Sequence, residues 1–173
     1  MSGVLAEDGE GEGDDGAVGL LVGVGRLDED LLHARRPLIH GLDGPREAIR
    51  RGMLAAGVGL DDLDLAEVHD CFTIAELLIY EAMGLAEPGQ GVKALEDGIV
   101  YPGGALPINL SGGLKAKGHP VGATGVSMHV MVSRQVTGDA GEMQAPGAST
   151  GLVFNMGGSG VANYCSVLEA VKA

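Results

Sequence analysis

The sequence predicts an α/β fold in which helices cover a mixed β-sheet. Apolar residues make up 45% of the 173 residues and aromatic residues only 3%, so aliphatic side chains must form most of the core. Short apolar runs of strand length alternate with stretches of helical periodicity, in the order strand, helix, strand, helix, helix, strand, strand. The 31 glycines cluster between these runs, which indicates tight turns and close backbone approaches.

The first segment, residues 1–16, is expected to be an acidic flexible tail. Its composition of acids among glycines buries too little apolar surface to become ordered. The acids that define it are Glu7, Asp8, Glu10, Glu12, Asp14 and Asp15. Residues 17–173 are expected to form one domain, which opens with a buried strand over the apolar sequence AVGLLVGVG at 17–25.

A helix is predicted over residues 44–57. Pro45 suits a first helical turn, Ile49 and Met53 are spaced for one face together with Leu54, and Gly57 is a typical end. Three basic residues on the opposite face are expected to meet water: Arg46, Arg50 and Arg51.

A strand over residues 63–68 is predicted to lead directly into a helix through His69. Thr73 and Glu76 have the spacing of a capping box at the start of this helix, and Gly84 is expected to end it. Such a junction places side chains at the carboxyl end of a strand, the edge where α/β proteins commonly place their sites.

Frequent glycine and proline predict a long ordered loop over residues 85–113, a type of segment that often carries function. Helical periodicity resumes over 121–138. Two β-type runs, 152–156 and 161–167, are separated by the glycine-rich residues 157–160, which predicts a hairpin at the carboxyl end.

Charge and cysteine content exclude several classes of function. The net charge of -13 argues against binding to nucleic acid or to an anionic membrane surface. No run of 18 apolar residues is present, so no membrane span is expected. The two cysteines, Cys71 and Cys165, do not form a disulfide framework, and a soluble protein of the reducing cytoplasm is the simpler expectation.

His119 is the most informative position for chemistry. The sequence GHP at 118–120 predicts a bend just before a helix, where the helix dipole disfavours the imidazolium and leaves the ring available as a base. A neutral histidine in that place can activate a thiol. Taken alone, a histidine in a glycine and proline turn is more often structural or merely exposed.

Cys71 and His69 stand together at the predicted strand end. A thiol at the start of a helix can serve as a proton donor, although an isolated free cysteine is more often a small buried apolar side chain. Cys165 fits that structural interpretation better, because it falls inside a predicted strand with no base near it in the sequence.

Gly157 and Gly158 allow two interpretations. Their N–H groups can stabilise an oxyanion at a reacting carbonyl, or they can simply form the hairpin turn. No metal site is expected, because the remaining histidines lack the spacing of metal ligands. These are His33, His40 and His129.

Three linked motifs resemble those of the carboxyl-terminal halves of thiolases. They read EVHDCFT at 67–73, SGGLKAKGHPVGATG at 111–125 and NMGGSG at 155–160, in the order and spacing of that family. The HDCF form, in place of the NEAF form of degradative and biosynthetic thiolases, resembles the sterol-carrier-protein type and its archaeal and bacterial relatives. The resemblance covers roughly residues 16–171.

This resemblance implies a thiolase-like fold, one lobe with a five-stranded mixed sheet and helices on both faces. It also implies an acetyl-CoA acetyltransferase or 3-ketoacyl-CoA thiolase, an acyltransferase that cleaves a 3-ketoacyl thioester or forms it by Claisen condensation. Acyl-coenzyme A and coenzyme A would be its substrates, and no cofactor is expected.

Roles for four residues follow from the same resemblance. His119 would be the base that activates the nucleophilic cysteine. His69 would help to form the oxyanion hole for the thioester oxygen, and Cys71 would move the proton at the α-carbon. Gly157 would contribute its N–H to the oxyanion hole around the acyl-enzyme. The family's usual CxG motif is NMG here, at 155–157, so proton transfer would fall to Cys71.

The nucleophilic cysteine of thiolases belongs to the amino-terminal half, and no part of this chain resembles that half. We therefore expect the chain to act as one part of a split enzyme, with a separate amino-terminal half and in a dimer or higher oligomer. Two other interpretations stay open. A non-catalytic remnant or interaction subunit is favoured by the acidic start, and a retro-aldolase related to thiolases is disfavoured by the presence of His119.

Overall fold

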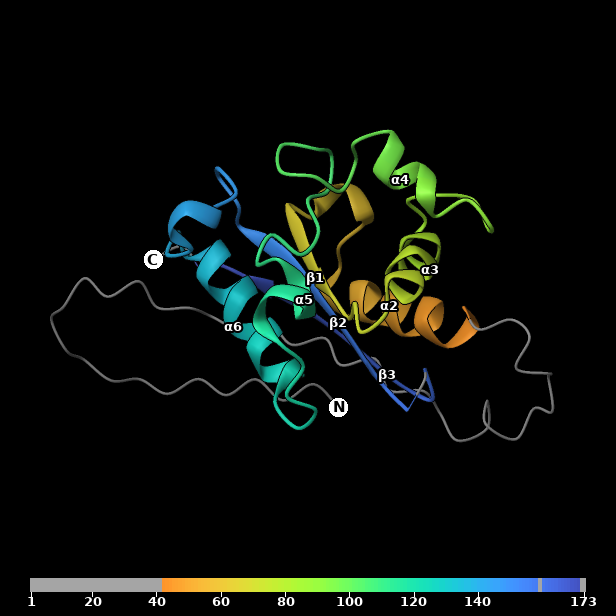
Figure 1. Ribbon diagram of the computed structural model, residues 1–173. Helices are drawn as coiled ribbons and strands as arrows, with labels where there is room; N and C mark the ends of the chain where they lie inside the picture. The colour runs from red at the N-terminus through yellow and green to blue at the C-terminus, as the bar shows by residue number, and fades with distance from the viewer. Residues whose placement is uncertain (1–41, 159, 172–173) are drawn as a thin grey trace, which may run out of the picture.

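A three-stranded mixed sheet forms the centre of the computed structural model, which describes residues 42–158 and 160–171 (Figure 1). Its strands are β1 (Leu65–Val68), β2 (Thr150–Gly157) and β3 (Ala162–Glu169), in that spatial order. β1 runs parallel to β2, with Val68 opposite Phe154, and β2 runs antiparallel to β3. The predicted α/β class and the hairpin at the carboxyl end are confirmed.

The described part of the chain contains fewer strands than the five that the resemblance implies. At the free edge of β1, a single parallel bridge joins Ala66 to Ile108 and extends the sheet by one residue pair. The strand expected over 17–25 and the acidic tail expected over 1–16 lie outside the described residues.

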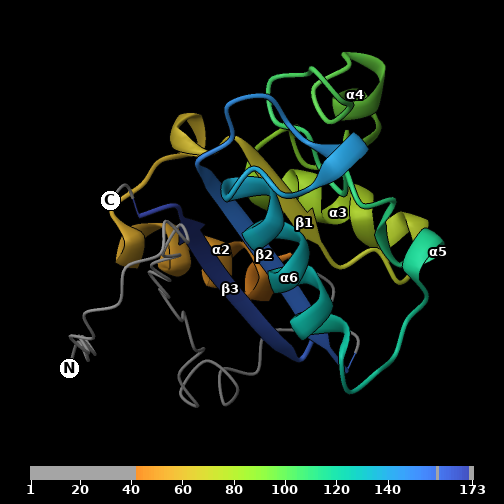
Figure 2. The same ribbon diagram turned by 90° about the vertical axis from the view of Figure 1, so that its left-hand side faces the viewer.

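Helices cover both faces of the sheet, as expected. The helices are α2 (Asp43–Ala56), α3 (Thr73–Met83), α4 (Val92–Glu96), α5 (Gly113–Lys117) and α6 (Thr124–Val136), with 3-10 turns at Leu60–Asp62 and Gly141–Met143. Figure 2 shows α6 lying across one face of β2, with α2 on the opposite face. Among the described residues, no helix has both the length and the apolar character needed to cross a membrane.

Alternation along β2 divides the core into two layers. Successive strand residues point to opposite faces, so Leu152 and Phe154 pack toward α2 and α3 while Val153 packs toward α6. All three side chains are fully buried. Because both faces of the sheet are covered, β2 reads as a continuous apolar run rather than as an alternating one.

α2 matches its predicted bounds, but Leu54, expected on one face with Ile49 and Met53, is exposed. Gly57 ends it in the left-handed conformation, with φ of 71°, and its N–H bonds to the carbonyl oxygen of Leu54. Of the three arginines expected to face water, Arg46 and Arg50 are exposed. Arg51 is half-buried, and its Nε lies 2.6 Å from the carboxylate of Glu47.

The predicted capping box of α3 is wrong. Phe72 is the N-cap residue, no side chain caps the helix, and Thr73 is the first helical residue. The carboxylate of Glu76 is occupied elsewhere, because it accepts a hydrogen bond from Nδ2 of Asn109 at 2.8 Å. A contact with a distant loop therefore replaces the local one that the spacing predicted.

Two other boundaries differ from prediction. The segment 85–113, predicted to be a loop, includes the helix α4. Its five residues are too few to show a helical period in the sequence, and it buries the side chain of Ala94. A buried carboxylate supports its start, since Oε1 of Glu81 accepts the N–H of Gly91 at 2.8 Å. α6 begins at Thr124 rather than at Val121.

Two leucines test the assignment of the core. We expect Leu152→Ala, in the fully buried centre of β2, to lower the free energy of unfolding by about 2–5 kcal/mol. The same substitution at Leu54, whose side chain is 69% exposed on α2, should change it by no more than about 0.5 kcal/mol. Urea denaturation followed by circular dichroism measures both values, and equal effects would contradict the assignment.

Candidate functional site

The candidate site lies where β1 ends. His69 follows the last residue of β1, and its backbone N–H donates to the carbonyl oxygen of Phe154 at 3.0 Å. This bond continues the ladder between β1 and β2 by one residue, and it places His69 beside Asn155. Two rigid strands therefore fix the position of this histidine.

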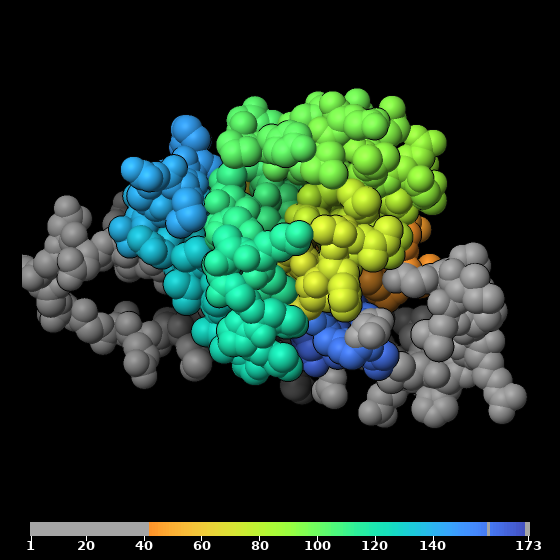
Figure 3. All heavy atoms as spheres, in the orientation of Figure 1, coloured from red at the N-terminus to blue at the C-terminus, as the bar shows by residue number. Residues whose placement is uncertain are grey.

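All four residues expected to form the site line one cavity of about 590 Å³. His69 and Cys71 reach it from the junction between β1 and α3, His119 from the segment before α6, and Gly157 from the end of β2. Residues that are far apart in the sequence are thus brought together as the motifs predicted. The spheres of residues 69–78 and of residues 113–123 adjoin on the face seen in Figure 3.

Apolar side chains form much of the remaining wall of the cavity and stay open to solvent. They come from the start of α3 and from the segment before α6. The most exposed are Phe72 at 71%, Ile74 at 60% and Val121 at 86%. Large apolar side chains exposed together around a cavity are typical of a surface that binds a ligand or another protein.

The two histidine rings meet edge to face, with centroids 5.0 Å apart and an interplanar angle of 78°. Nδ1 of His69 lies 2.8 Å from Oδ1 of Asn155. Burial lowers the pKa of His69, the hydrogen bond to Asn155 raises it, and the neighbouring His119 lowers it further. Because burial has the largest effect, the ring of His69 is neutral at pH 7.

A buried threonine holds the ring of His119. Oγ1 of Thr124 lies 2.7 Å from Nδ1 of His119, and the same hydroxyl donates to the carbonyl oxygen of Pro120 at 3.2 Å. When its proton is directed to Pro120, the hydroxyl can accept from Nδ1–H of His119, and a neutral ring held in this way has its unprotonated nitrogen at Nε2. The predicted bend is present, and this side-chain bond fixes the orientation of the His119 ring within it.

The two cysteines differ sharply in their surroundings. Cys71 is half-buried and lines the cavity. Cys165 is fully buried in the core, where burial raises the pKa of its thiol to about 12. It packs so closely against α2 that a Cβ added to Gly52 would lie 2.6 Å from its Sγ. The expectation that Cys165 is a core residue is confirmed.

Gly157 occupies the end of β2, opposite Ala162 in the hairpin, and is exposed at the cavity. The turn beyond it uses Gly158, with φ of 57°, whose carbonyl oxygen accepts the N–H of Val161. The turn of the hairpin is therefore formed by the residues after Gly157. The role of the Gly157 N–H in an oxyanion hole stays a prediction.

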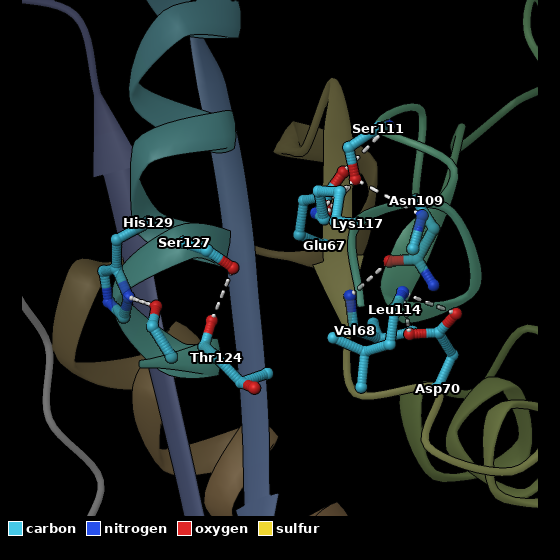
Figure 4. A network of polar contacts seen from close by, with 12 residues as sticks. Glu67, Val68, Asp70, Asn109, Ser111, Leu114, Lys117, Thr124, Ser127 and His129 are labelled. Atoms are coloured by element: carbon cyan, nitrogen blue, oxygen red, sulfur yellow. Dashed lines mark hydrogen bonds and ion pairs between the residues drawn. The ribbon is translucent and has the colours of Figure 1, made fainter. Parts of the chain in front are cut away.

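A buried ionic network supports the segment that leads to His119, and sequence reasoning missed it. The carboxylate of Glu67, only 2% exposed, lies 2.8 Å from Nζ of Lys117 and accepts the hydroxyl of Ser111 at 2.7 Å (Figure 4). Nζ of Lys117 also donates to Ser111. The available signal was an acidic residue in the motif at 67–73 and a basic residue in the motif at 111–125. A charge buried in a strand needs a partner of opposite charge, so this pair of motifs could have predicted the contact.

Two further side chains attach this segment to the end of β1. Oδ1 of Asn109 accepts the N–H of Val68 at 2.9 Å, and Asn109 itself has a positive φ of 54°. The carboxylate of Asp70 accepts the N–H of Leu114 at 2.9 Å. Gly113 has φ of 63°, and any Cβ there would collide with Asp70 (Figure 4 shows the bond to Leu114).

Within residues 42–158 and 160–171, no three His, Cys, Asp or Glu side chains form a group that could hold a metal ion.

Removal of the lysine tests the ionic network. We expect Lys117→Met to lower the free energy of unfolding by about 3–5 kcal/mol, because it leaves the charge of Glu67 buried without its partner. Lys115→Met, on the exposed side of α5, is the matched control and should have an effect within about 0.5 kcal/mol. A Glu67→Gln and Lys117→Met double variant that lost more stability than Lys117→Met alone would contradict this account.

Thiol labelling tests the environments of the two cysteines. Iodoacetamide at pH 8 should modify Cys71 in the folded chain and leave Cys165 unmodified, because Cys165 is buried with a raised pKa. Mass spectrometry after proteolysis identifies the modified residue. Both thiols should react in urea, and modification of Cys165 in the folded Cys71→Ser variant would show that the core is open.

Comparison with known proteins adds to this geometry. The family described as thiolase C-terminal domain-like matches residues 26–170. Acetyl-CoA acetyltransferase of Methanothermobacter thermautotrophicus is 44% identical over 129 residues, 75% of this chain and 33% of that protein. Sterol carrier protein 2 of Rattus norvegicus is 45% identical over 122 residues, 70% of this chain and 22% of that protein. The subunit BbsB of benzoylsuccinyl-CoA thiolase from Thauera aromatica is 41% identical over 55% of this chain.

Solved structures share the fold. A structure described as the Ltp2-ChsH2(DUF35) aldolase superposes with a TM-score of 0.67 and 25% identity, over 86% of this chain and 38% of that one. The acetyl-CoA acetyltransferase of Bacillus anthracis superposes with a TM-score of 0.56 and 22% identity, over 87% of this chain and 29% of that one. The chain spans about a third or less of the length of the curated relatives.

Proposed function

Because this chain belongs to the family of thiolase C-terminal domain-like proteins, we propose that it supplies the proton-transfer half of an acyltransferase acting on coenzyme A thioesters. The observation that carries the proposal is the convergence of His119, Cys71, His69 and Gly157 on one cavity. A base with an unprotonated ring nitrogen, a half-buried thiol and a backbone N–H at a strand end are the groups that such a reaction needs.

In the proposed cleavage reaction, Nε2 of His119 takes the proton from a cysteine thiol of the amino-terminal half. The thiolate attacks the 3-keto carbon of the substrate, the bond between C2 and C3 breaks, and the acyl group stays on that cysteine. Cys71 gives a proton to the carbanion at C2, while His69, once its Nε2 carries a proton, stabilises the thioester oxygen on which the negative charge develops.

The second half of the reaction transfers the acyl group to coenzyme A. The thiolate of Cys71 takes the proton of the coenzyme A thiol, whose sulfur attacks the acyl-enzyme. The cysteine of the amino-terminal half leaves as a thiolate and takes back its proton from His119. The N–H of Gly157 stabilises the oxyanion of this step. Every bond change is a transfer of an acyl group or a proton, so the proposed reaction needs no cofactor.

A partner half is part of this proposal, because a base and a proton donor do not form an acyl-enzyme without a nucleophile. The exposed apolar side chains of Phe72, Ile74 and Val121 at the cavity favour burial against another protein. Two relatives support an assembly in this family, since one is named as a thiolase subunit and another is described as the Ltp2-ChsH2(DUF35) aldolase.

A retro-aldol reaction is the second candidate, because one structure of the same fold is described as an aldolase. The two reactions differ in their need for thiols. Thiolytic cleavage requires coenzyme A and the partner's cysteine, whereas retro-aldol cleavage of a 3-hydroxyacyl thioester releases an aldehyde or ketone and requires neither.

Turnover of acetoacetyl-CoA tests the proposed function. The chain would be co-expressed with an amino-terminal thiolase half, and the coenzyme A-dependent loss of acetoacetyl-CoA absorbance would be measured. His119→Ala should lower kcat at least about 100-fold, because the base is lost. His129→Ala is the matched control, since His129 lies on α6 outside the cavity and bonds to the carbonyl oxygen of Gly125 in its own helix.

Full activity of the His119→Ala variant would overturn the proposal. Release of an aldehyde or ketone from a 3-hydroxyacyl thioester without coenzyme A would instead support the retro-aldol reaction.

A further inference from the structure

The two histidines of the cavity are held through the same ring nitrogen by different side chains. Nδ1 of His119 lies against the hydroxyl of Thr124, and Nδ1 of His69 lies 2.8 Å from the amide oxygen of Asn155. An amide oxygen only accepts hydrogen bonds, so Nδ1 of His69 must carry a proton. A neutral imidazole has one N–H, which leaves Nε2 of His69 unprotonated.

We propose that Asn155 is a positioning residue that fixes His69 as the tautomer protonated on Nδ1. Nε2 then meets the cavity as a proton acceptor, and it becomes a donor to a substrate oxygen only after it takes up a proton. The role of His69 toward a substrate oxygen rests on the proposed function. The assignment of its tautomer to Asn155 does not.

The surroundings of Asn155 hold its amide in this orientation. The bond between the N–H of His69 and the carbonyl of Phe154 fixes the two backbones side by side. On its other side, the amide lies over the first turn of α6, where a Cβ added to Gly125 would be 2.9 Å from Nδ2 of Asn155. The amide oxygen is placed against His69 and the amide nitrogen against α6, so a bulkier residue at position 125 would displace the amide.

The groups around His69 decide when Nε2 gains its proton. Asp70 favours the charged ring and His119 disfavours it, while Cys71 and Tyr164 are the other titratable groups lining the cavity. Burial keeps the ring neutral, because it lowers the pKa of His69. An anionic oxygen in the cavity would favour the charged ring, so we expect anion binding to be accompanied by proton uptake at His69.

The tautomer is measured directly by long-range ¹H–¹⁵N NMR on the full chain, without turnover. His129 provides an internal reference, because its Nδ1 lies 2.7 Å from the carbonyl oxygen of Gly125 and must carry the proton. Near pH 8, His69 should show the same pattern as His129, with Nδ1 protonated. Lowering the pH should then shift the ¹⁵N signal of Nε2, with a midpoint below the usual range.

Two variants separate the effect of Asn155 from that of the fold. Asn155→Asp keeps an acceptor oxygen and should keep Nδ1 protonated, whereas Asn155→Leu removes the acceptor and should shift the proton of His69 toward Nε2. Thr124→Val is the matched control at the other histidine and should alter the signals of His119 while those of His69 keep their pattern. Unchanged signals of His129 show that each variant has folded.

A proton on Nε2 of neutral His69 in the unaltered chain would overturn the proposal. An Asn155→Leu variant in which His69 stays protonated on Nδ1 would also overturn it. The spectrum of the unaltered chain tests the tautomer of His69 even where a variant fails to fold. An inactive chain with the expected tautomer would count against the proposed function alone.

Discussion

The site depends first on the buried ion pair between Glu67, in β1, and Lys117, at the end of α5. Removing two charges from water is costly, and the hydrogen bonds of Ser111 to the carboxylate of Glu67 help to offset that cost. The pair joins the sheet to the segment that carries His119, two residues beyond Lys117. The pair therefore holds the segment that carries His119 against the strand that ends beside His69.

Around this anchor, the site is assembled at the meeting point of three rigid elements. The end of β1 supplies His69 and Cys71, β2 supplies Asn155, and the first turn of α6 supplies the threonine that holds His119. Each histidine is bonded through Nδ1, so both rings direct Nε2 to other partners. Such an arrangement suits the proposed reaction, which begins by removing a proton from a thiol.

The sequence was sufficient for the parts of the structure that depend on local patterns. The apolar runs of β2 and β3 predicted the hairpin, Gly57 predicted the end of α2, and the linked motifs predicted which residues would share a cavity. Prediction failed where a distant group changes a local preference. Glu76 bonds to Asn109 rather than capping α3, because a loop 33 residues away brings an amide to its carboxylate. The hydrogen bonds of Asn155 and Lys117 likewise exist only after the chain has folded.

The contact between Asp70 and α5 has a consequence for how such a sequence can change over evolutionary time. The carboxylate of Asp70 fills the space where a side chain at position 113 would stand, and it binds the backbone of the next residue. A larger residue at 113 is excluded while Asp70 remains, and another residue at 70 would leave the N–H of Leu114 without its acceptor. The Asp of HDCF and the second Gly of SGG therefore share one steric contact, and a change at either position is disfavoured while the other residue is present.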